Sequence, residues 1–253
     1  MKSSQIALCL IVLIASCLQA QESILPPPYM FVRTSLIKVG NEYGTAFVID
    51  HRNKQYLVTA KHLVSSLPAK NAVVQLFQSF EWRNLKVNIV TCKNEDVDAV
   101  ALQFDTPDKI SLDPAIEPLG KSVVLLGSEV FFFGYPSGGL HTLAANNGQY
   151  LPFVKHGFLS ASDWTNTDAV IYYVDGFNNK GFSGGPIIGF VQDKKEWRVI
   201  AVVSGYLPES TQVKVGREMV DSKQMVNSGI LVGYSIQHVL DAIDSSLEAG
   251  ASR

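Results

Sequence analysis

Short runs of β-branched and aromatic residues, separated by clusters of turn-forming residues, follow one another along most of the chain. This pattern is typical of an all-β protein, because strands of a few residues joined by tight turns leave no room for a longer apolar period. The segment 50–54 between two runs predicts a hairpin loop. The predicted strands cover residues 30–39, 44–50, 56–59, 72–77, 85–92, 98–104, 123–126, 130–135, 170–174, 186–190 and 199–203.

One stretch has the period of an amphipathic helix. Its apolar residues fall on one face, and Ser235 can cap the first turn; they are Ile236, Val239, Leu240, Ile243 and Leu247. A second, shorter turn of helix is predicted around residues 60–67. The sequence therefore predicts a mostly β protein that ends in a helix over 235–247.

Residues 106–122 contain three prolines and little periodicity, and they divide the strand-rich region into two halves of similar size. We expect one β barrel over about 30–105 and a second over about 123–234, with 106–122 as the linker between them. Residues 21–29, which include three consecutive prolines, predict an extended lead-in. The domain as a whole is expected to span 30–247.

The N-terminus has the pattern of a signal peptide. Residues 1–20 hold one lysine and then an uncharged apolar run over 6–18. A run of this length is too short to span a bilayer, which takes about 20 residues, but it suits a signal-peptide core. Ala20 is a suitable small residue at the cleavage site, so we expect a secreted or periplasmic protein.

A second interpretation of the same segment stays open. Residues 14–17 (IASC) resemble the lipobox of bacterial lipoproteins, in which the cysteine is lipidated after cleavage. Lipidation at Cys17 would anchor the protein to a membrane. In either case Cys92 alone of the three cysteines belongs to the mature domain, which must fold on its apolar core without an internal disulfide.

Composition and charge narrow the function classes. Of the 253 residues, 47% are hydrophobic and 17% are charged, which is enough to bury a large core. The net charge is −2, with 21 Lys and Arg against 23 Asp and Glu. This balance argues against a nucleic acid as the main partner, since phosphate binding needs a basic surface.

The sharpest motif is residues 181–186 (GFSGGP), which place Ser183 between glycines. A nucleophilic serine needs its hydroxyl exposed on a tight turn, with backbone N–H groups pointing at the developing oxyanion. Glycines permit such backbone conformations at no steric cost. The motif therefore predicts a nucleophile at Ser183.

Two further segments supply the partners of such a serine. Residues 57–62 (LVTAKH) form a strand-like run that ends in a turn carrying His62, and Asp98 opens the apolar strand 98–102 (DAVAL). The order His, Asp, Ser is one of the few that build a Ser-His-acid site. Asp96 and Glu95 are alternative acids, but the apolar run starts directly after Asp98, which favours Asp98.

The chain resembles trypsin-like serine proteases of the chymotrypsin fold, and it is most similar to their bacterial, HtrA-like branch. Residues 59–62 resemble the family's T-A-x-H, residues 98–102 its D-[IL]-A-[LV]-L and residues 181–186 its G-[ND]-S-G-G-P. Weaker matches lie at 44–49 (GTAFVI), 157–160 (GFLS) and 233–236 (GYSI). No room for a PDZ domain is left after residue 247, so the resemblance covers the protease domain alone.

The resemblance implies a fold and a set of roles. The fold would be two six-stranded antiparallel barrels with the site between them. Ser183 would attack the scissile carbonyl, His62 would transfer the proton and Asp98 would orient the imidazole. The backbone N–H groups of Gly181 and Ser183 would form the oxyanion hole. Protein or peptide substrates are expected, and neither a metal nor an organic cofactor is required.

Two departures from the family pattern change the expected specificity and regulation. Phe182 stands where the activatable trypsin group has an aspartate that pairs with a newly cut N-terminus, so this kind of zymogen activation is not expected. Phe177, six residues before Ser183, would lie at the floor of the S1 pocket. With 204–206 (Ser204, Gly205 and Tyr206) as a wall of that pocket, it favours a small or apolar residue at P1 over Arg or Lys.

Two other classes compete with a protease. The string 181–185 also fits the G-x-S-x-G elbow of α/β-hydrolases, with Asp221 and His238 as formal partners. That fold needs a helix directly after the serine, whereas 186–191 has the composition of a strand, so we reject this reading. A catalytically silent trypsin-like binding protein is the remaining alternative.

Overall fold

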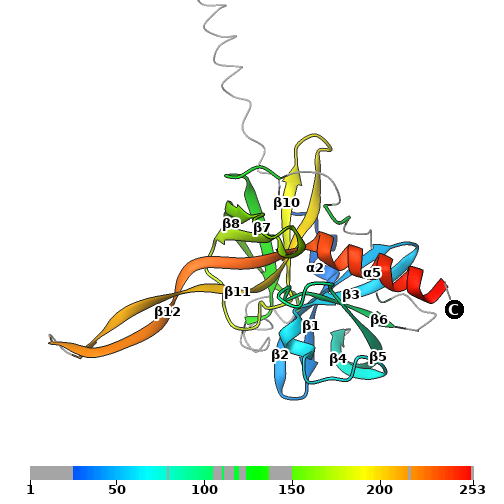
Figure 1. Cartoon of the computed structure of the whole chain (residues 1–253), viewed down its shortest axis with the longest axis horizontal. Helices are drawn as coiled ribbons and strands as arrows, with labels where there is room; N and C mark the ends of the chain where they lie inside the picture. The colour runs from blue at the N-terminus through cyan, green and yellow to red at the C-terminus, as the bar shows by residue number, and fades with distance from the viewer. Residues whose placement is uncertain are drawn as a thin grey trace, which may run out of the picture.

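The computed structural model describes residues 25–78, 80–104, 110, 117–119, 124–136, 150–215 and 218–251 (Figure 1). The expected signal peptide over 1–20, including Cys17, lies outside the described residues. So does most of the expected linker, of which residues 110 and 117–119 are described.

Two closed barrels of six antiparallel strands make up most of the described chain, which confirms the predicted all-β fold. The first barrel, in the order β1-β2-β3-β6-β5-β4, consists of β1 (Thr34–Val39), β2 (Glu42–His51), β3 (Lys54–Thr59), β4 (Ala72–Gln78), β5 (Glu81–Thr91) and β6 (Val100–Phe104). The second, in the order β10-β11-β12-β9-β8-β7, consists of β7 (Glu129–Gly134), β8 (Phe153–Asp163), β9 (Ile171–Asp175), β10 (Pro186–Val191), β11 (Glu196–Val215) and β12 (Glu218–Ser235). The described helical segments are α2 (Tyr29–Val32), α3 (Lys61–Val64), the 3-10 turn η2 (Thr167–Ala169) and α5 (Ile236–Ala251).

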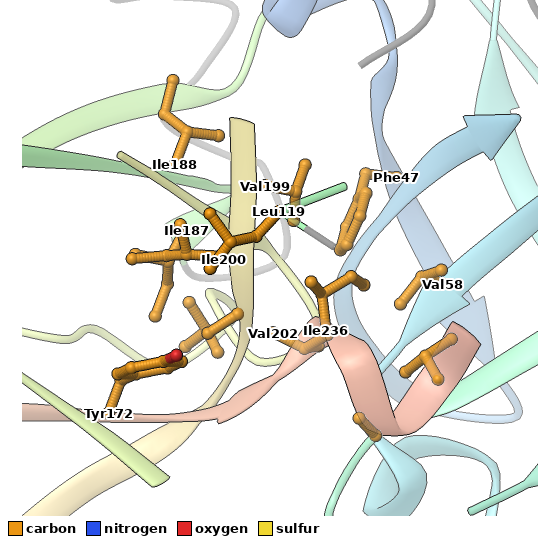
Figure 2. Packing of buried hydrophobic residues seen from close by; sticks show 14 of the residues in the cluster. Phe47, Val58, Leu119, Tyr172, Ile187, Ile188, Val199, Ile200, Val202 and Ile236 are labelled. Atoms are coloured by element: carbon orange, nitrogen blue, oxygen red, sulfur yellow. The ribbon is translucent and has the colours of Figure 1, made fainter. Parts of the chain in front are cut away.

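Strands β1, β2 and β3 of the first barrel bury both of their faces over most of their length, because side chains alternate along a strand and each face meets a different apolar layer. Val48 and Leu57 point into the first barrel. Their neighbours Phe47 and Val58 point outward, into a core shared with the second barrel and α5 (Figure 2). Ile236, at the start of α5, joins the same core. The two barrels are thus joined by a continuous apolar layer.

The predicted C-terminal helix is confirmed as α5, which begins one residue later than expected and continues to Ala251. The Ser235 hydroxyl accepts a hydrogen bond from the backbone N–H of Gln237 at 3.3 Å, as an N-terminal cap does. The helix packs on β5, β6 and β11 and so touches both barrels. Over the part of the chain that is described, no helix has the length and apolar character needed to cross a membrane.

One predicted strand is only partly right, and a second is wrong. The first part of 30–39 is helical, because the N–H of Met30 donates to the carbonyl of Pro27, a helical turn that prolines favour at its start. The strand β1 begins only at Thr34. Of the predicted strand 123–126, the described residues belong to no strand, and Leu125 accepts from the N–H of Ser128 at 3.1 Å in a turn that contains Gly127, where φ is +83°. The hairpin loop 50–54 is confirmed as the β2–β3 turn.

The last two strands continue far beyond the second barrel. β11 and β12 pair from Ala201 and Ser235 outward to Val215 and Glu218, and together they form a two-stranded ribbon that projects from the body (Figure 1). We call its outer part, residues 207–228, the arm. The edges of the arm that face away from its own pairing carry no partner strand among the described residues. Sequence analysis did not predict the arm.

Cys92 is the cysteine of the described residues, and it follows β5 directly. Its side chain is buried, and its Sγ donates to the carbonyl of Ala99 at 3.2 Å. Burial raises the pKa of this thiol to about 12. Cys92 thus stands at the end of the predicted strand 85–92, one residue after β5 ends.

Candidate active site

His62 lies on the short helix α3, directly after β3 has ended at Thr59. Ala60 keeps an extended backbone between the two elements, so the chain turns out of the barrel wall. Leu63 and Val64 are buried and fix the helix against the barrel, while about half of the His62 side chain remains exposed. The imidazole is therefore anchored at its backbone and accessible at its ring.

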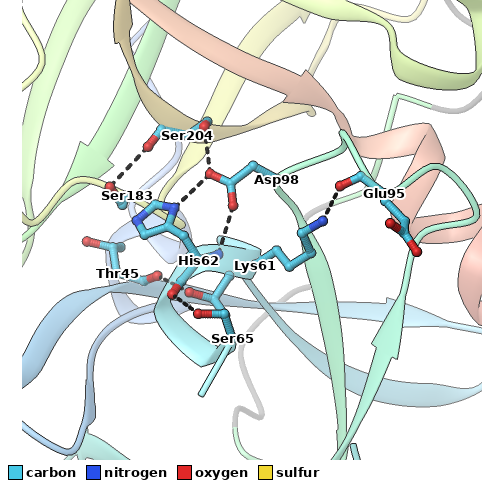
Figure 3. Close-up of polar contacts among 9 residues, drawn as sticks. Thr45, Lys61, His62, Ser65, Glu95, Asp98, Ser183 and Ser204 are labelled. Carbon is cyan, nitrogen blue, oxygen red and sulfur yellow. Dashed lines mark hydrogen bonds and ion pairs between the residues drawn. The ribbon is translucent and has the colours of Figure 1, made fainter. Parts of the chain in front are cut away.

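Asp98 precedes β6, and its carboxylate accepts three hydrogen bonds. Two come from His62, through Nδ1 at 2.7 Å and the backbone N–H at 2.8 Å. The third comes from the Ser204 hydroxyl at 2.6 Å (Figure 3). The alternative acids Asp96 and Glu95 are exposed, and among the described residues the acid that pairs with His62 is Asp98.

These contacts shift the pKa values of His62 and Asp98. The hydrogen bond to Asp98 raises the pKa of His62, outweighing the burial that would lower it. Burial by itself would raise the pKa of Asp98, but hydrogen bonds from His62 and Ser204 outweigh this effect and lower that pKa overall. An ionised carboxylate only accepts, so Nδ1 of His62 carries a proton and Nε2 is left as the acceptor.

Ser183 comes from the second barrel, on the turn that leads into β10. Its hydroxyl donates to the carbonyl of Ser204 at 3.1 Å, and among the described residues it makes no hydrogen bond to His62. Ser204 thereby touches both ends of the site, since its own hydroxyl binds Asp98. The three predicted residues are thus connected through Ser204, as Figure 3 shows.

The backbone around Ser183 offers free donors. Neither the N–H of Gly181 nor that of Ser183 has an acceptor within the part of the chain described. Gly181 has a φ of +102°, a conformation that favours glycine, and a Cβ at this position would lie 2.2 Å from the carbonyl oxygen of Tyr135. The sequence motif therefore places a glycine where the backbone needs one.

Thr45, which sequence analysis placed only in a strand, holds this turn from the first barrel. Its hydroxyl donates to the carbonyl of Gly181 at 2.7 Å, and its N–H donates to the carbonyl of Ser183 at 2.8 Å. Thr45 is completely buried. The resemblance of 44–49 to a family strand gave the position but not these two contacts.

The residues expected to shape the S1 pocket lie on two segments. Phe177 is on the loop after β9 and is 54% exposed. Ser204, Gly205 and Tyr206 are consecutive on β11, where the strand leaves the barrel for the arm. Gly205 pairs with Val232, and Tyr206 is 43% exposed. Within the described residues no group of His, Cys, Asp and Glu side chains is arranged to hold a metal ion.

Comparisons with known proteins agree with this geometry. Residues 44–202 match the sequence profile of the trypsin-like peptidase domain, and this range includes His62, Asp98 and Ser183. No curated protein matches the chain in sequence.

Solved structures with the same fold are proteases with low sequence identity to this chain. A serine endoprotease from Yersinia pestis is 15% identical with a TM-score of 0.57, and the match covers 89% of this chain and 69% of that one. The HtrA-type protease AlgW, solved with a tripeptide, is 17% identical with a TM-score of 0.56, over 87% of this chain and 61% of that one. The active form of the Rv3671c protease from M. tuberculosis is 15% identical with a TM-score of 0.54, over 87% and 86%.

The family profile covers more than half of the chain, from Gly44 in β2 to Val202 in β11. The fold of two antiparallel barrels and the neighbouring structures agree with it. The chain therefore belongs to the trypsin-like peptidase family, and it is a serine endopeptidase that acts on peptide or protein substrates.

Proposed function

We propose that Ser183, His62 and Asp98 form the catalytic triad of this endopeptidase and that the reaction passes through an acyl-enzyme. The observation that carries the proposal is the continuous set of hydrogen bonds from Ser183 through Ser204 to Asp98 and His62. It connects the three residues across the two barrels. The protonated Nδ1 of His62 leaves Nε2 able to accept the serine proton.

In the proposed acylation step, the Ser183 hydroxyl turns from the Ser204 carbonyl towards Nε2 of His62 when substrate enters. Its oxygen attacks the scissile carbonyl carbon while its proton passes to Nε2. The carbonyl oxygen becomes an oxyanion that the free N–H groups of Gly181 and Ser183 bind. When the C–N bond breaks, His62 gives the proton to the leaving amine, and an ester to Ser183 remains.

Deacylation repeats the same steps with water. His62 takes a proton from a water molecule, whose oxygen attacks the ester carbonyl. The second tetrahedral intermediate collapses, the bond to Ser183 breaks, and His62 returns the proton to the serine oxygen. The negatively charged Asp98 stabilises the imidazolium in both halves of the reaction.

A fluorophosphonate probe tests this assignment, because it labels only an activated serine. We expect purified protein to be labelled, and Ser183→Ala to give no labelling. If the wild type is not labelled, the alternative of a catalytically silent trypsin-like binding protein takes its place. Equal labelling of wild type and Ser183→Ala would place the nucleophile elsewhere.

We further propose a non-tryptic preference, for a small or apolar residue at P1. Residues 177–180 (FNNK) contain no acidic side chain that could pair with Arg or Lys. The ammonium of Lys155 lies against Phe177 and adds positive charge at this loop, which disfavours a cationic P1 side chain. A peptide-library cleavage profile measures the preference, and a profile dominated by Arg or Lys at P1 would contradict it.

Export is proposed from the sequence of residues 1–20. Mass spectrometry of the mature protein from its native host measures the N-terminus. A start at Gln21 supports a secreted or periplasmic protein, whereas a lipid-modified Cys17 at the N-terminus supports the anchored form. An intact Met1 would contradict both.

A further inference from the structure

The loop that carries the proposed nucleophile, residues 177–183, is held from outside by two side chains. We call it the serine loop. The ammonium of Lys155, on β8, donates to the carbonyl of Phe177 at 2.6 Å and also to the side-chain oxygen of Asn179. The side-chain amide of Asn227, at the base of the arm, donates to the carbonyl of Asn178 at 2.6 Å.

Two more donors fix the rest of the loop backbone. The N–H of Phe182 donates to the carbonyl of Asn179 at 3.1 Å, and the Thr45 hydroxyl holds the carbonyl of Gly181. The carbonyls of residues 177, 178, 179 and 181 therefore each have a donor. No described residue donates to the carbonyl of Lys180. The peptide between Lys180 and Gly181 is left without a bond of its own.

That peptide contains one of the two proposed oxyanion donors, the N–H of Gly181. A peptide is planar, so rotating it turns its carbonyl and its N–H together. If it turned over, the carbonyl oxygen would point where the N–H points now, and the hole would lose a donor. Its orientation depends on the neighbouring peptides, which Lys155, Asn227 and Thr45 hold.

Lys155 is enclosed by the serine loop rather than paired with an acid. Its Nζ lies 5.5 Å from the ring centre of Phe177 and 5.2 Å from that of Phe182, which is completely buried. In the described part of the chain it makes no ion pair. The ammonium of Lys155 therefore contacts neutral oxygen atoms and aromatic rings of this loop. Both kinds of contact stabilise an ammonium group.

We propose that Lys155 is a positioning residue for the reaction: its ammonium holds the serine loop in the conformation that keeps the N–H groups of Gly181 and Ser183 free for the oxyanion. The inference rests on the proposed function, since it concerns the same oxyanion hole. The proposal also bears on Phe182, which stands where the activatable trypsins have an aspartate. Where the activatable trypsins pair an aspartate with a new N-terminus, this chain supplies the Lys155 ammonium from β8, which needs no cleavage to form.

Three variants test the proposal. Lys155→Met keeps most of the length of the side chain and removes its charge and its hydrogen-bond donors, Lys155→Arg keeps the charge, and Lys194→Met is a control. Lys194 is exposed on the β10–β11 turn, away from the site. For Lys155→Met we expect kcat to fall on the order of 100-fold, as when an oxyanion donor is lost. We expect KM to stay within about threefold, because ground-state contacts of the substrate remain.

The conservative variant separates positioning from packing. Lys155→Arg should recover at least part of kcat, and Lys194→Met should behave as wild type. A peptide boronate, whose adduct with Ser183 is tetrahedral, should bind Lys155→Met much more weakly than wild type, while a non-reactive peptide of the same sequence should bind both equally. Lys155→Met with kcat within twofold of wild type would overturn the proposal, and so would equal loss of boronate and peptide binding.

Two further measurements decide the case if Lys155→Met folds poorly or if the protein is inactive. Asn227→Ala removes a donor to the same loop from a partly buried position at the base of the arm. An unchanged kcat in this variant would count against the loop being held as described. Amide hydrogen exchange of residues 177–183 is measured in the Ser183→Ala background. Faster exchange on adding Lys155→Met supports the proposal without any activity, and unchanged exchange contradicts it. Failure of fluorophosphonate labelling in wild type would instead remove the proposed function.

Discussion

Asp98 shares its carboxylate among three donors, and this sharing sets the charge of both Asp98 and His62. The hydrogen bond from His62 Nδ1 raises the pKa of the imidazole. The hydroxyl of Ser204 holds the same carboxylate oxygen as Nδ1 does. His62 is thus a stronger base than a free histidine, which in the proposed mechanism would help it to take the serine proton.

The pH dependence of the reaction follows from this shift. Proton transfer needs neutral His62, so the rate should rise with pH through the pKa of His62, with a midpoint above the ordinary value of 6.5. In Asp98→Asn the main cause of the raised pKa is gone. The midpoint should therefore move to lower pH, and the plateau rate should fall on the order of 10⁴-fold. Fluorophosphonate labelling rates measured across pH would check both expectations.

Ser183→Ala serves as the blank in that experiment. A midpoint that is the same in wild type and Asp98→Asn would mean that Asp98 does not control the titrating group. The assignment of the general base to His62 would then need another source for the shift.

At the residue scale, sequence could predict identities but not the contacts between distant side chains. His62, Asp98 and Ser183 stand in motifs, so these three residues could be predicted from the sequence. Ser204 was predicted only as a pocket wall, since its bond to Asp98 joins residues 106 positions apart. Lys155 has no motif at all, because its role depends on how β8 lies under the serine loop.

The C-terminal helix α5 is fastened to the first barrel by a charged cluster at the β2–β3 turn. Asp244 on the helix accepts from Arg52 at 2.9 and 3.0 Å and contacts His51 at 2.8 Å. Hydrogen bonding to Arg52, together with His51, lowers the pKa of Asp244 to about 2 despite partial burial. The cluster therefore links the last element of the described chain to one of the first.

The stability contributed by Asp244 should depend on pH in a defined direction. Its folded-state pKa is depressed, so the contribution is complete above the ordinary carboxyl pKa of 3.8 and is lost as pH falls toward about 2. Asp244→Asn should melt on the order of 1–3 °C below wild type at pH 7, as for a surface ion pair, with the difference shrinking in acid. Thermal melts at several pH values measure this. A difference that grows in acid would contradict it.

At the element scale, a strong periodicity of apolar residues was enough to predict a helix or strand, and a weak periodicity was not. The helix α5 and most barrel strands have apolar residues at the required spacing, so they were predicted. The helix α2 was missed because its four residues are too few to show a period, and backbone bonds to Pro27 and Pro28 determine it. The arm was missed because its residues 207–212 are exposed, and an exposed ribbon has no buried face to alternate with.

At the scale of the whole molecule, the two barrels meet at Gly184, next to the proposed nucleophile. A Cβ on Gly184 would lie 2.2 Å from the carbonyl oxygen of Thr45 and 2.3 Å from the Thr59 hydroxyl oxygen, both in the first barrel. Its φ of +83° also favours glycine. The absence of a side chain lets the backbone of one barrel approach the other closely enough to assemble the site.

Gly184→Ala should therefore separate the barrels at the site as well as strain the turn. We expect the melting temperature to fall by several degrees, as is typical when a packed position receives an extra methyl group. We also expect fluorophosphonate labelling to be lost. Gly127→Ala is a matched control, since Gly127 has the same φ of +83° but nothing within 4 Å of its added Cβ. If the two variants lose stability equally and both are labelled, strain alone would explain Gly184 and the close approach would not matter.

The buried Cys92 has a consequence for where this enzyme can fold. With its thiol enclosed and protonated at neutral pH, it is a poor partner for disulfide exchange. The described fold therefore has no oxidised and reduced forms, and its stability is expected to be indifferent to glutathione or dithiothreitol. The described domain is therefore expected to fold equally well in an oxidising compartment and in a reducing cytosol.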